Sequence, residues 1–128
     1  GAFDETQLQE LQPLGENCPS CDLSGAKLNR EDLSKKNLTE ADLTQAYLNG
    51  ADLSEANLSW ANLTWAVLTE ANLTGADLTK AKLNWANLTG ADLTEAELTG
   101  ASLTGANLTR TIFCETEMTD GTMNNSGC

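Results

Sequence analysis

Leucine returns at every fifth residue through most of this chain. The series runs without a break from Leu23 to Leu108, eighteen leucines in all, and Phe113, Met118 and Met123 continue it in the same phase. Alanine stands two residues before most of these positions, first at residue 26 and then at every fifth position from 41 to 106. The positions between them are mostly Asp, Asn, Ser, Thr, Gly, Glu and Lys. A fixed internal period of this kind is the first signal to interpret in a sequence.

A period of five residues fits neither common element of secondary structure. On an α-helix each step of five residues turns by about 500°, which spreads the leucines around the axis and leaves no apolar stripe. On a strand an odd step moves each leucine to the opposite face. The period instead fits a chain that turns a corner of about 90° in every repeat, so that four repeats, or twenty residues, close a square. Leucine and the alanine two residues before it then both point inward, as alternate strand residues do.

Stacked squares of this kind form a solenoid, because one coil alone cannot bury its leucines but neighbouring coils can. Residues 21–120 hold twenty repeats, which make about five coils and a body about 24 Å long at the spacing of strands in a sheet. We therefore predict an all-β solenoid. Its expected parts are an N-terminal capping segment (residues 1–17), the β-helix (residues 18–120) and a C-terminal capping tail (residues 121–128).

The repeat A-(D/N)-L-(T/S)-x, present as ADLTQ, ANLTG and ADLTE, resembles that of the pentapeptide-repeat family and covers about four fifths of the chain. The resemblance implies a right-handed, quadrilateral β-helix. The entry CPSCDLSG and the ending FCETEMTDGTMNNSGC resemble exported members of the family from cyanobacteria and the chloroplast thylakoid lumen. This second resemblance implies a location in a periplasm or a thylakoid lumen.

The segment before the repeat carries the signals of a short helix. Asp4 is placed to cap it, with Gln7 at the third position of a capping box, and Leu8 and Leu11 lie on one apolar face. Since Pro13 is poorly tolerated inside a helix, we expect the helix to end just before it. We interpret the helix as a lid over an open solenoid end that would otherwise expose leucines and unpaired strand groups. An amphipathic helix that binds a partner is the alternative.

The repeat is least regular at its two ends. Glu31 and Lys36 replace the inward alanine near the start, which we interpret as a local departure from ideal geometry because buried charge is costly. Thr111 and Thr116 take the same place near the end. The sequence after them is rich in turn formers, and we expect it to make a last partial coil that folds over the open end.

The charge of the chain excludes several classes of partner. The net charge is −12, with seven basic residues and no histidine. A nucleic-acid binder needs a basic surface against the phosphates, and binding to an anionic membrane surface needs one too. No run approaches the length of a membrane-spanning helix, so we expect no membrane insertion. The chain begins at Gly1 without a visible signal peptide, as a mature or tagged form would.

Four cysteines, Cys18, Cys21, Cys114 and Cys128, suggest either a metal site or disulfides. Because the two pairs belong to opposite ends of the solenoid, they cannot share one zinc ion. We expect a disulfide between Cys114 and Cys128, which would close a loop of about fifteen residues and contribute about 3 kcal/mol. Cys18 and Cys21 fall in inward places, so they are either small apolar core groups or a second disulfide.

The chain offers no catalytic constellation. Without histidine it lacks the Ser-His-Asp and Cys-His arrangements, and a core filled by Leu and Ala leaves no cavity. We therefore expect no enzyme activity, no cofactor and no metal site. Acidic residues recur in two outward columns, which could hold a divalent cation but which we interpret as solvated surface; these are Asp32, Asp52 and Asp92 in one and Asp77, Glu97 and Glu117 in the other.

One group of residues breaks the polar rule of the surface. Trp60, Trp65 and Trp85 occupy an outward corner place, and Tyr47 and Val67 occupy outward places just beyond the edge that Trp65 and Trp85 share. Exposed aromatic patches mark partner sites in many proteins. The alternative is that the stacked rings only cover the corner and each other.

Two functional hypotheses follow. The first is a non-enzymatic scaffold outside the cytoplasm, a monomer that binds an unknown protein partner. The second is a mimic of duplex DNA that binds gyrase, as the resemblance to the quinolone-resistance proteins of the family implies and the charge of −12 suits. Those proteins are cytoplasmic and longer, and they dimerise through an apolar end. In this chain the tail is instead expected to be closed by the disulfide between Cys114 and Cys128. We therefore favour the scaffold.

Overall fold

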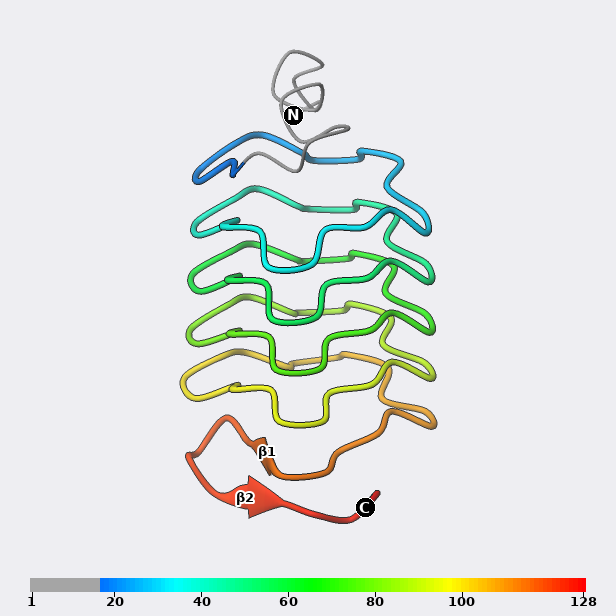
Figure 1. Ribbon diagram of the computed structural model, residues 1–128, viewed down its shortest axis with the longest axis vertical. Helices are drawn as coiled ribbons and strands as arrows, with labels where there is room; N and C mark the ends of the chain where they lie inside the picture. The colour runs from blue at the N-terminus through cyan, green and yellow to red at the C-terminus, as the bar shows by residue number, and fades with distance from the viewer. Residues whose placement is uncertain (1–16) are drawn as a thin grey trace.

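The structure is a computed structural model that describes residues 17–128. These residues form a stack of four-sided coils with the C-terminus at one end (Figure 1). The lid helix expected in residues 1–17 lies outside the described residues, apart from the last position of that segment.

The coils are held together by a ladder of parallel bridges. Every isolated bridge joins residues 20 apart, from Asp22 with Asp42 to Glu97 with Glu117. The backbone N–H of Leu63 donates to the C=O of Lys82 at 2.7 Å, and the N–H of Lys82 donates to the C=O of Ala61 at 2.9 Å. The prediction that four repeats close one coil is therefore confirmed.

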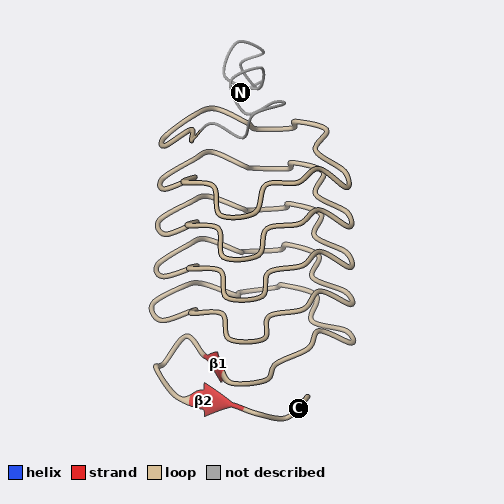
Figure 2. Ribbon diagram, in the orientation of Figure 1, coloured by secondary structure: helices blue, strands red, loops and turns tan. Residues whose placement is uncertain are grey.

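Regular strands are short because each side of a coil pairs through a single residue before the chain turns again. Within the described residues the only strands longer than a bridge are β1 (Thr116–Glu117) and β2 (Met123–Asn124), which pair antiparallel (Figure 2). The solenoid is therefore a β structure in its hydrogen bonding, although most of its residues lie in turns and isolated bridges.

Leucine and alanine fill the interior. The leucines from Leu23 to Leu98 have at most 1% of their surface exposed, as do the alanines from Ala26 to Ala96. All of them belong to one continuous hydrophobic cluster, since each coil covers the apolar side chains of the next. The prediction that both positions point inward is confirmed.

Each corner is a β-turn closed by the leucine carbonyl. The N–H of Ala26 donates to the C=O of Leu23 at 3.0 Å, and the same bond recurs along the chain. The residue two places after leucine has a positive φ, between 49° and 62° where it is not glycine. This φ is the mark of a type II turn, and it costs about 1–2 kcal/mol in a residue with a side chain. None of the non-glycine residues at this place is β-branched, which would raise the cost further.

Where the residue before a leucine is Asp or Asn, its side chain stabilises the corner that follows. Asn62 Oδ1 accepts hydrogen bonds from the N–H and the Oγ1 hydroxyl of Thr64, at 3.1 and 2.6 Å. Aspartate plays the same part in other repeats, as Asp32 does toward Ser34. Asp and Asn recur there because both offer the acceptor that a local turn of this kind requires. The hydrogen bonds from the Ser34 side chain and backbone lower the pKa of Asp32 below its ordinary value.

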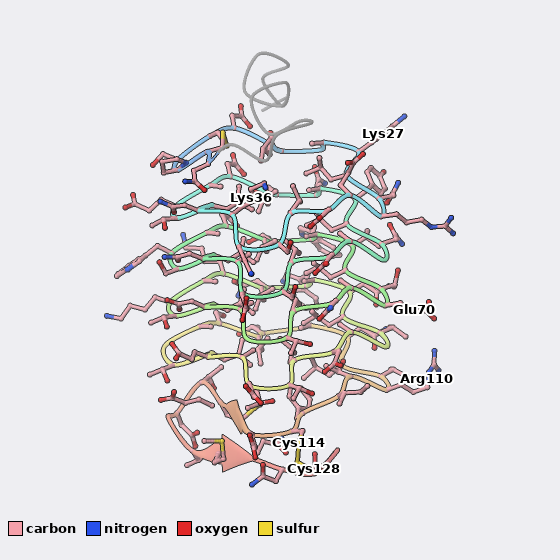
Figure 3. The ribbon with its side chains drawn as sticks, in the orientation of Figure 1. Lys27, Lys36, Glu70, Arg110, Cys114 and Cys128 are labelled. Atoms are coloured by element: carbon pink, nitrogen blue, oxygen red, sulfur yellow. A yellow bond between two sulfur atoms is a disulfide. The ribbon has the colours of Figure 1, made fainter. Side chains whose placement is uncertain are left out.

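The irregular positions of the inward columns are accommodated at the two ends. Glu31 and Lys36 are half-buried in the first coils; Figure 3 labels Lys36. At the other end Thr111 Oγ1 donates to the C=O of Leu88 at 2.8 Å, and Thr116 Oγ1 donates to the C=O of Leu93 at 2.7 Å. The two hydroxyls that replace alanine are therefore hydrogen-bonded to the coil before them.

A charge in the core should destabilise the whole stack. In Leu63→Asp a carboxylate would replace a fully buried side chain and find no partner among leucines and alanines, so we expect a loss of about 3–5 kcal/mol or failure to fold. Thermal unfolding followed by circular dichroism measures it. Asn62→Asp is the matched control, because it adds the same charge one residue away on the outer face; equal melting of the two variants would contradict the inward assignment.

The hydrogen bonds to Asp32 should make stability depend on pH in the acid range. Because its folded-state pKa lies below the ordinary 3.8, its ionised form stabilises the fold above that pH, and this contribution disappears as pH falls through the lower folded-state value. Asp32→Asn keeps the Oδ1 acceptor but does not titrate. We expect the difference in melting temperature between the wild type and this variant to shrink below about pH 4; a difference that stays constant down to pH 2 or so would contradict the shift.

Candidate interaction surface

The corner residues with positive φ form four columns along the solenoid, and their side chains lean toward the next coil. A Cβ placed on Gly75 would lie 3.3 Å from Glu55 Cγ, and one on Gly105 would lie 2.2 Å from Trp85 Cε3. Where glycine follows a long corner side chain at a distance of twenty residues, as at these two positions, that side chain therefore covers the glycine. What a column presents to solvent depends on which residues follow one another at that spacing.

Trp65 and Trp85 follow one another in one column and stack. Their ring centroids lie 5.7 Å apart with the planes 15° from parallel. Trp85 in turn lies over Gly105, where any side chain would collide with its ring. The two indoles remain 55% and 51% exposed, so the stack orders the rings without removing them from solvent.

The face beyond this corner adds two further apolar side chains. Tyr47 and Val67 are bridged neighbours in adjacent coils, and Tyr47 is 45% exposed. A shallow hollow beside the stack is lined by Gly25, Gln45, Tyr47, Trp65 and Val67. We name the group of Tyr47, Trp65, Val67 and Trp85 the aromatic patch. The sequence analysis did not single out Gln45 and Gly25, although the twenty-residue spacing places both in the column of Trp65.

Trp60 is not part of this group. It lies one repeat before Trp65, which is a quarter of a coil away, and its column continues with Lys80. The Lys80 Nζ lies 5.0 Å from the centroid of the Trp60 ring, a cation–π contact. Trp60 shares the outward corner place of Trp65 and Trp85 in the repeat, but it lies at the neighbouring corner with a cation of its own.

Carboxylates gather around the corner diagonally opposite the aromatic patch. That corner lies two repeats, or half a coil, from the Trp65 column, and it is flanked by the two acidic columns. We name this group the acidic edge; its members are Asp32, Asp52, Glu55, Asp77, Asp92, Glu95, Glu97, Glu115 and Glu117. The ion pair between Lys35 and Glu55, at 3.8 Å between exposed side chains, contributes little. The patch and the edge are therefore separate surfaces.

The cysteines lie in two pairs at the two ends of the described chain. The sulfur atoms of Cys114 and Cys128 are at bonding distance, 2.09 Å, and link the tail to the last coil (Figure 3). Those of Cys18 and Cys21 are also at bonding distance, 2.16 Å, and both residues are buried. The two alternatives for Cys18 and Cys21, core groups or a second disulfide, are therefore compatible, since both residues are buried and their sulfur atoms are at bonding distance. In residues 17–128 no group of His, Cys, Asp or Glu is arranged to hold a metal ion.

Comparison with known proteins assigns the chain to a family. The family described as pentapeptide repeats (8 copies) matches residues 17–55, 56–94 and 91–126. The chain belongs to this family, whose members fold as right-handed quadrilateral β-helices. A search of curated protein sequences found no significant match. Within the described part of the chain no helix is long and apolar enough to cross a membrane.

Several solved structures of the family resemble this one. HetL, a protein involved in heterocyst differentiation regulation from the cyanobacterium Nostoc sp. strain PCC 7120, has a TM-score of 0.83 and 39% identity over 84% of this chain and 51% of its own. This chain thus spans about half the length of HetL. Rfr23 from the cyanobacterium Cyanothece 51142 has a TM-score of 0.67 and 32% identity, covering 90% of this chain and 96% of its own. A protein from the Arabidopsis thaliana thylakoid lumen has 32% identity over 82% of this chain and 70% of its own, with a TM-score of 0.45.

The pairing of Cys114 with Cys128 should hold the tail in place. Replacing both by serine removes a link across a separation of 14 residues, and we expect the tail to lose about 3 kcal/mol of local stability. Hydrogen exchange measures this at the Gly127 amide, which donates to the C=O of Phe113 at 2.7 Å. The Leu63 amide, in a central coil, is the internal control. The pairing would be contradicted if peptide mapping of the native protein, carried out without reductant, found both thiols free.

Proposed function

We propose that this protein is a non-enzymatic scaffold that binds another protein through the aromatic patch. The observation that carries the proposal is the stack of Trp65 on Trp85, which stays half exposed beside Tyr47. Tryptophan and tyrosine are the typical anchors of protein interfaces. A pre-ordered stack loses little conformational entropy on binding, because the two rings already hold each other in place.

The rest of the molecule suits a rigid support rather than a catalyst. We propose a monomer of about five coils, with residues 1–17 as the N-terminal cap, residues 18–120 as the β-helix and residues 121–128 as the C-terminal tail. Pentapeptide-repeat proteins generally act as non-enzymatic structural or interaction modules. The continuous core of leucine and alanine suits the same assignment, since side chains rather than a binding site occupy the interior of the described coils.

We place the protein outside the cytoplasm, in a periplasm or a thylakoid lumen. Both cysteine pairs lie at bonding distance, and lasting disulfides are typical of oxidising compartments. The location supports the scaffold over the gyrase-binding alternative, because gyrase is a cytoplasmic partner.

The acidic edge is the feature that favours the second candidate, a mimic of DNA that binds gyrase. Its carboxylates line two adjacent columns and the corner between them, as phosphates line a duplex. The aromatic patch lies at the opposite corner, so substitutions can weaken either surface without altering the other. The two functions are therefore separable by experiment.

Truncation of the stack should weaken partner binding. In Trp85→Ala the exposed anchor is lost and Trp65 loses its support, so we expect the affinity for the partner to fall by about 1 kcal/mol or more. The partner is recovered by crosslinking in native extract and its binding is then measured with purified protein. Trp60→Ala is the matched control, because it removes an equally exposed indole at a different corner; equal losses in both variants would contradict the patch.

The gyrase alternative predicts a different response. A DNA mimic acts through its carboxylates, so it should inhibit supercoiling, and added salt should weaken the inhibition by screening the charges. We expect no inhibition at micromolar protein, and no effect of Asp77→Asn with Glu97→Gln on partner binding beyond the association rate. Salt-sensitive inhibition that the same double substitution abolishes would overturn both the function and the location.

A further inference from the structure

Every inner coil presents the same set of backbone groups to the coil that follows. The N–H of each leucine and of the residue two places later donate onward, as Leu83 does to the C=O of Ser102 and Trp85 does to the C=O of Thr104, both at 2.8 Å. The C=O of the inward alanine accepts in return, as that of Ala81 does from the N–H of Ser102 at 3.0 Å. One side of a coil thus offers two donors and one acceptor toward the C-terminal end.

The C-terminal tail satisfies these groups on only part of the last coil. The chain reverses after β1, where the N–H of Met118 donates to the C=O of Thr122 at 2.7 Å, and it then runs back as β2 under the segment it has just left (Figure 1). Further along, the Glu115 N–H donates to Asn125 Oδ1 and the Gly127 N–H donates to the Phe113 C=O, both at 2.7 Å. The turn-rich sequence of the tail predicts that it folds over the open end, but the tail covers only the half that follows residue 112.

The other half, residues 101–110, remains an open edge. Six of its backbone groups would bond to a following coil, but within the described range 17–128 they form no hydrogen bond. They are the N–H groups of Leu103, Gly105, Leu108 and Arg110 and the C=O groups of Ala101 and Ala106. The side chains of Leu103, Ala106 and Leu108 are only partly buried, whereas the equivalent Leu83 and Leu88 one coil earlier are fully buried. The open edge therefore combines unpaired strand groups with incompletely covered leucines.

We propose that the open edge binds a segment of another protein as half of a further coil, with two bridge-paired sides and a corner between them, parallel to residues 101–110 and in the register of a next coil. Strand addition of this kind draws its affinity from backbone hydrogen bonds and its specificity from alternate side chains. The segment has to supply two carbonyls and one N–H on each side of the square. It also has to carry apolar residues at its inward places, above all at the two leucine places, where they cover Leu103 and Leu108.

The balance of donors and acceptors argues against a second copy of this chain that would meet this edge through its own open edge. The open edge holds four donors and two acceptors. Two copies that met through this edge would bring the same excess of donors from both sides, so at least half of the donors would find no acceptor. A segment in the register of a next coil has the opposite balance, with more acceptors than donors facing this edge. The coil beginning at Ala101 shows this balance toward the coil before it, since the C=O groups of Ser102 and Thr104 accept and the N–H of Ser102 donates.

The inference is tested with a synthetic peptide as the probe. The peptide ASLTGANLTR copies residues 101–110, and so has the pattern that a next coil would place on this edge. Amide exchange is measured by NMR on the full chain with and without the peptide. We expect saturable slowing of at least about tenfold at Leu103, Gly105, Leu108 and Arg110, with no change at exposed amides elsewhere.

Two controls make the test specific. A peptide with both leucines replaced by aspartate keeps the backbone but not the apolar side chains, and should give no slowing. Among protein variants, Leu108→Asp should reduce peptide binding, whereas Met123→Asp, in the tail that covers the other half, should not. The proposal is overturned if the four amides exchange at the same rate at millimolar peptide. It is equally overturned if they slow with protein concentration alone, which would make a second copy the occupant.

Discussion

The structure depends on one repeated interaction, the pairing of residues twenty positions apart. Each coil side contributes a donor from leucine, a donor from the corner residue and a return bond to the inward alanine, as Leu63, Trp65 and Ala61 illustrate. These bonds hold neighbouring coils at strand spacing, and that spacing lets leucines of successive coils cover one another. The core and the ladder are therefore the same feature, since neither forms without the other.

The corner residues carry the conformational cost of this arrangement, and their side chains differ from one repeat to the next. A positive φ at every fifth residue is unfavourable for residues other than glycine. The hydrogen bonds to the Asp and Asn side chains before the leucines, together with the ladder between coils, offset that cost. The corner side chain points away from the core, so it is free to vary. A column can hold two stacked indoles, a cation over an indole, or a row of carboxylates. The chemistry of each corner surface is consequently a matter of which residues recur there at intervals of twenty.

Much of this could be predicted from the sequence because the period is short and unbroken. The inward places of Leu63 and Ala61 and the contact of Trp65 with Trp85 follow from spacing alone. The same spacing separates Trp60 from that pair by a quarter of a coil. The reversal of the tail could not be predicted, because residues 121–128 leave the repeat. Their path depends on long-range contacts such as that of Gly127 with Phe113, and the open edge exists only because of that path.

The most direct test of this account is a measurement of which residues face each other in neighbouring coils. Nuclear Overhauser contacts between backbone protons report pairs of residues on adjacent strands, which lie about 4.8 Å apart. The account predicts contacts between Asn62 and Lys82, between Val67 and Asn87, and throughout the central coils between residues separated by 20. Contacts at a separation of three or five repeats, or a lack of any regular separation, would contradict the four-sided coil and every surface derived from it.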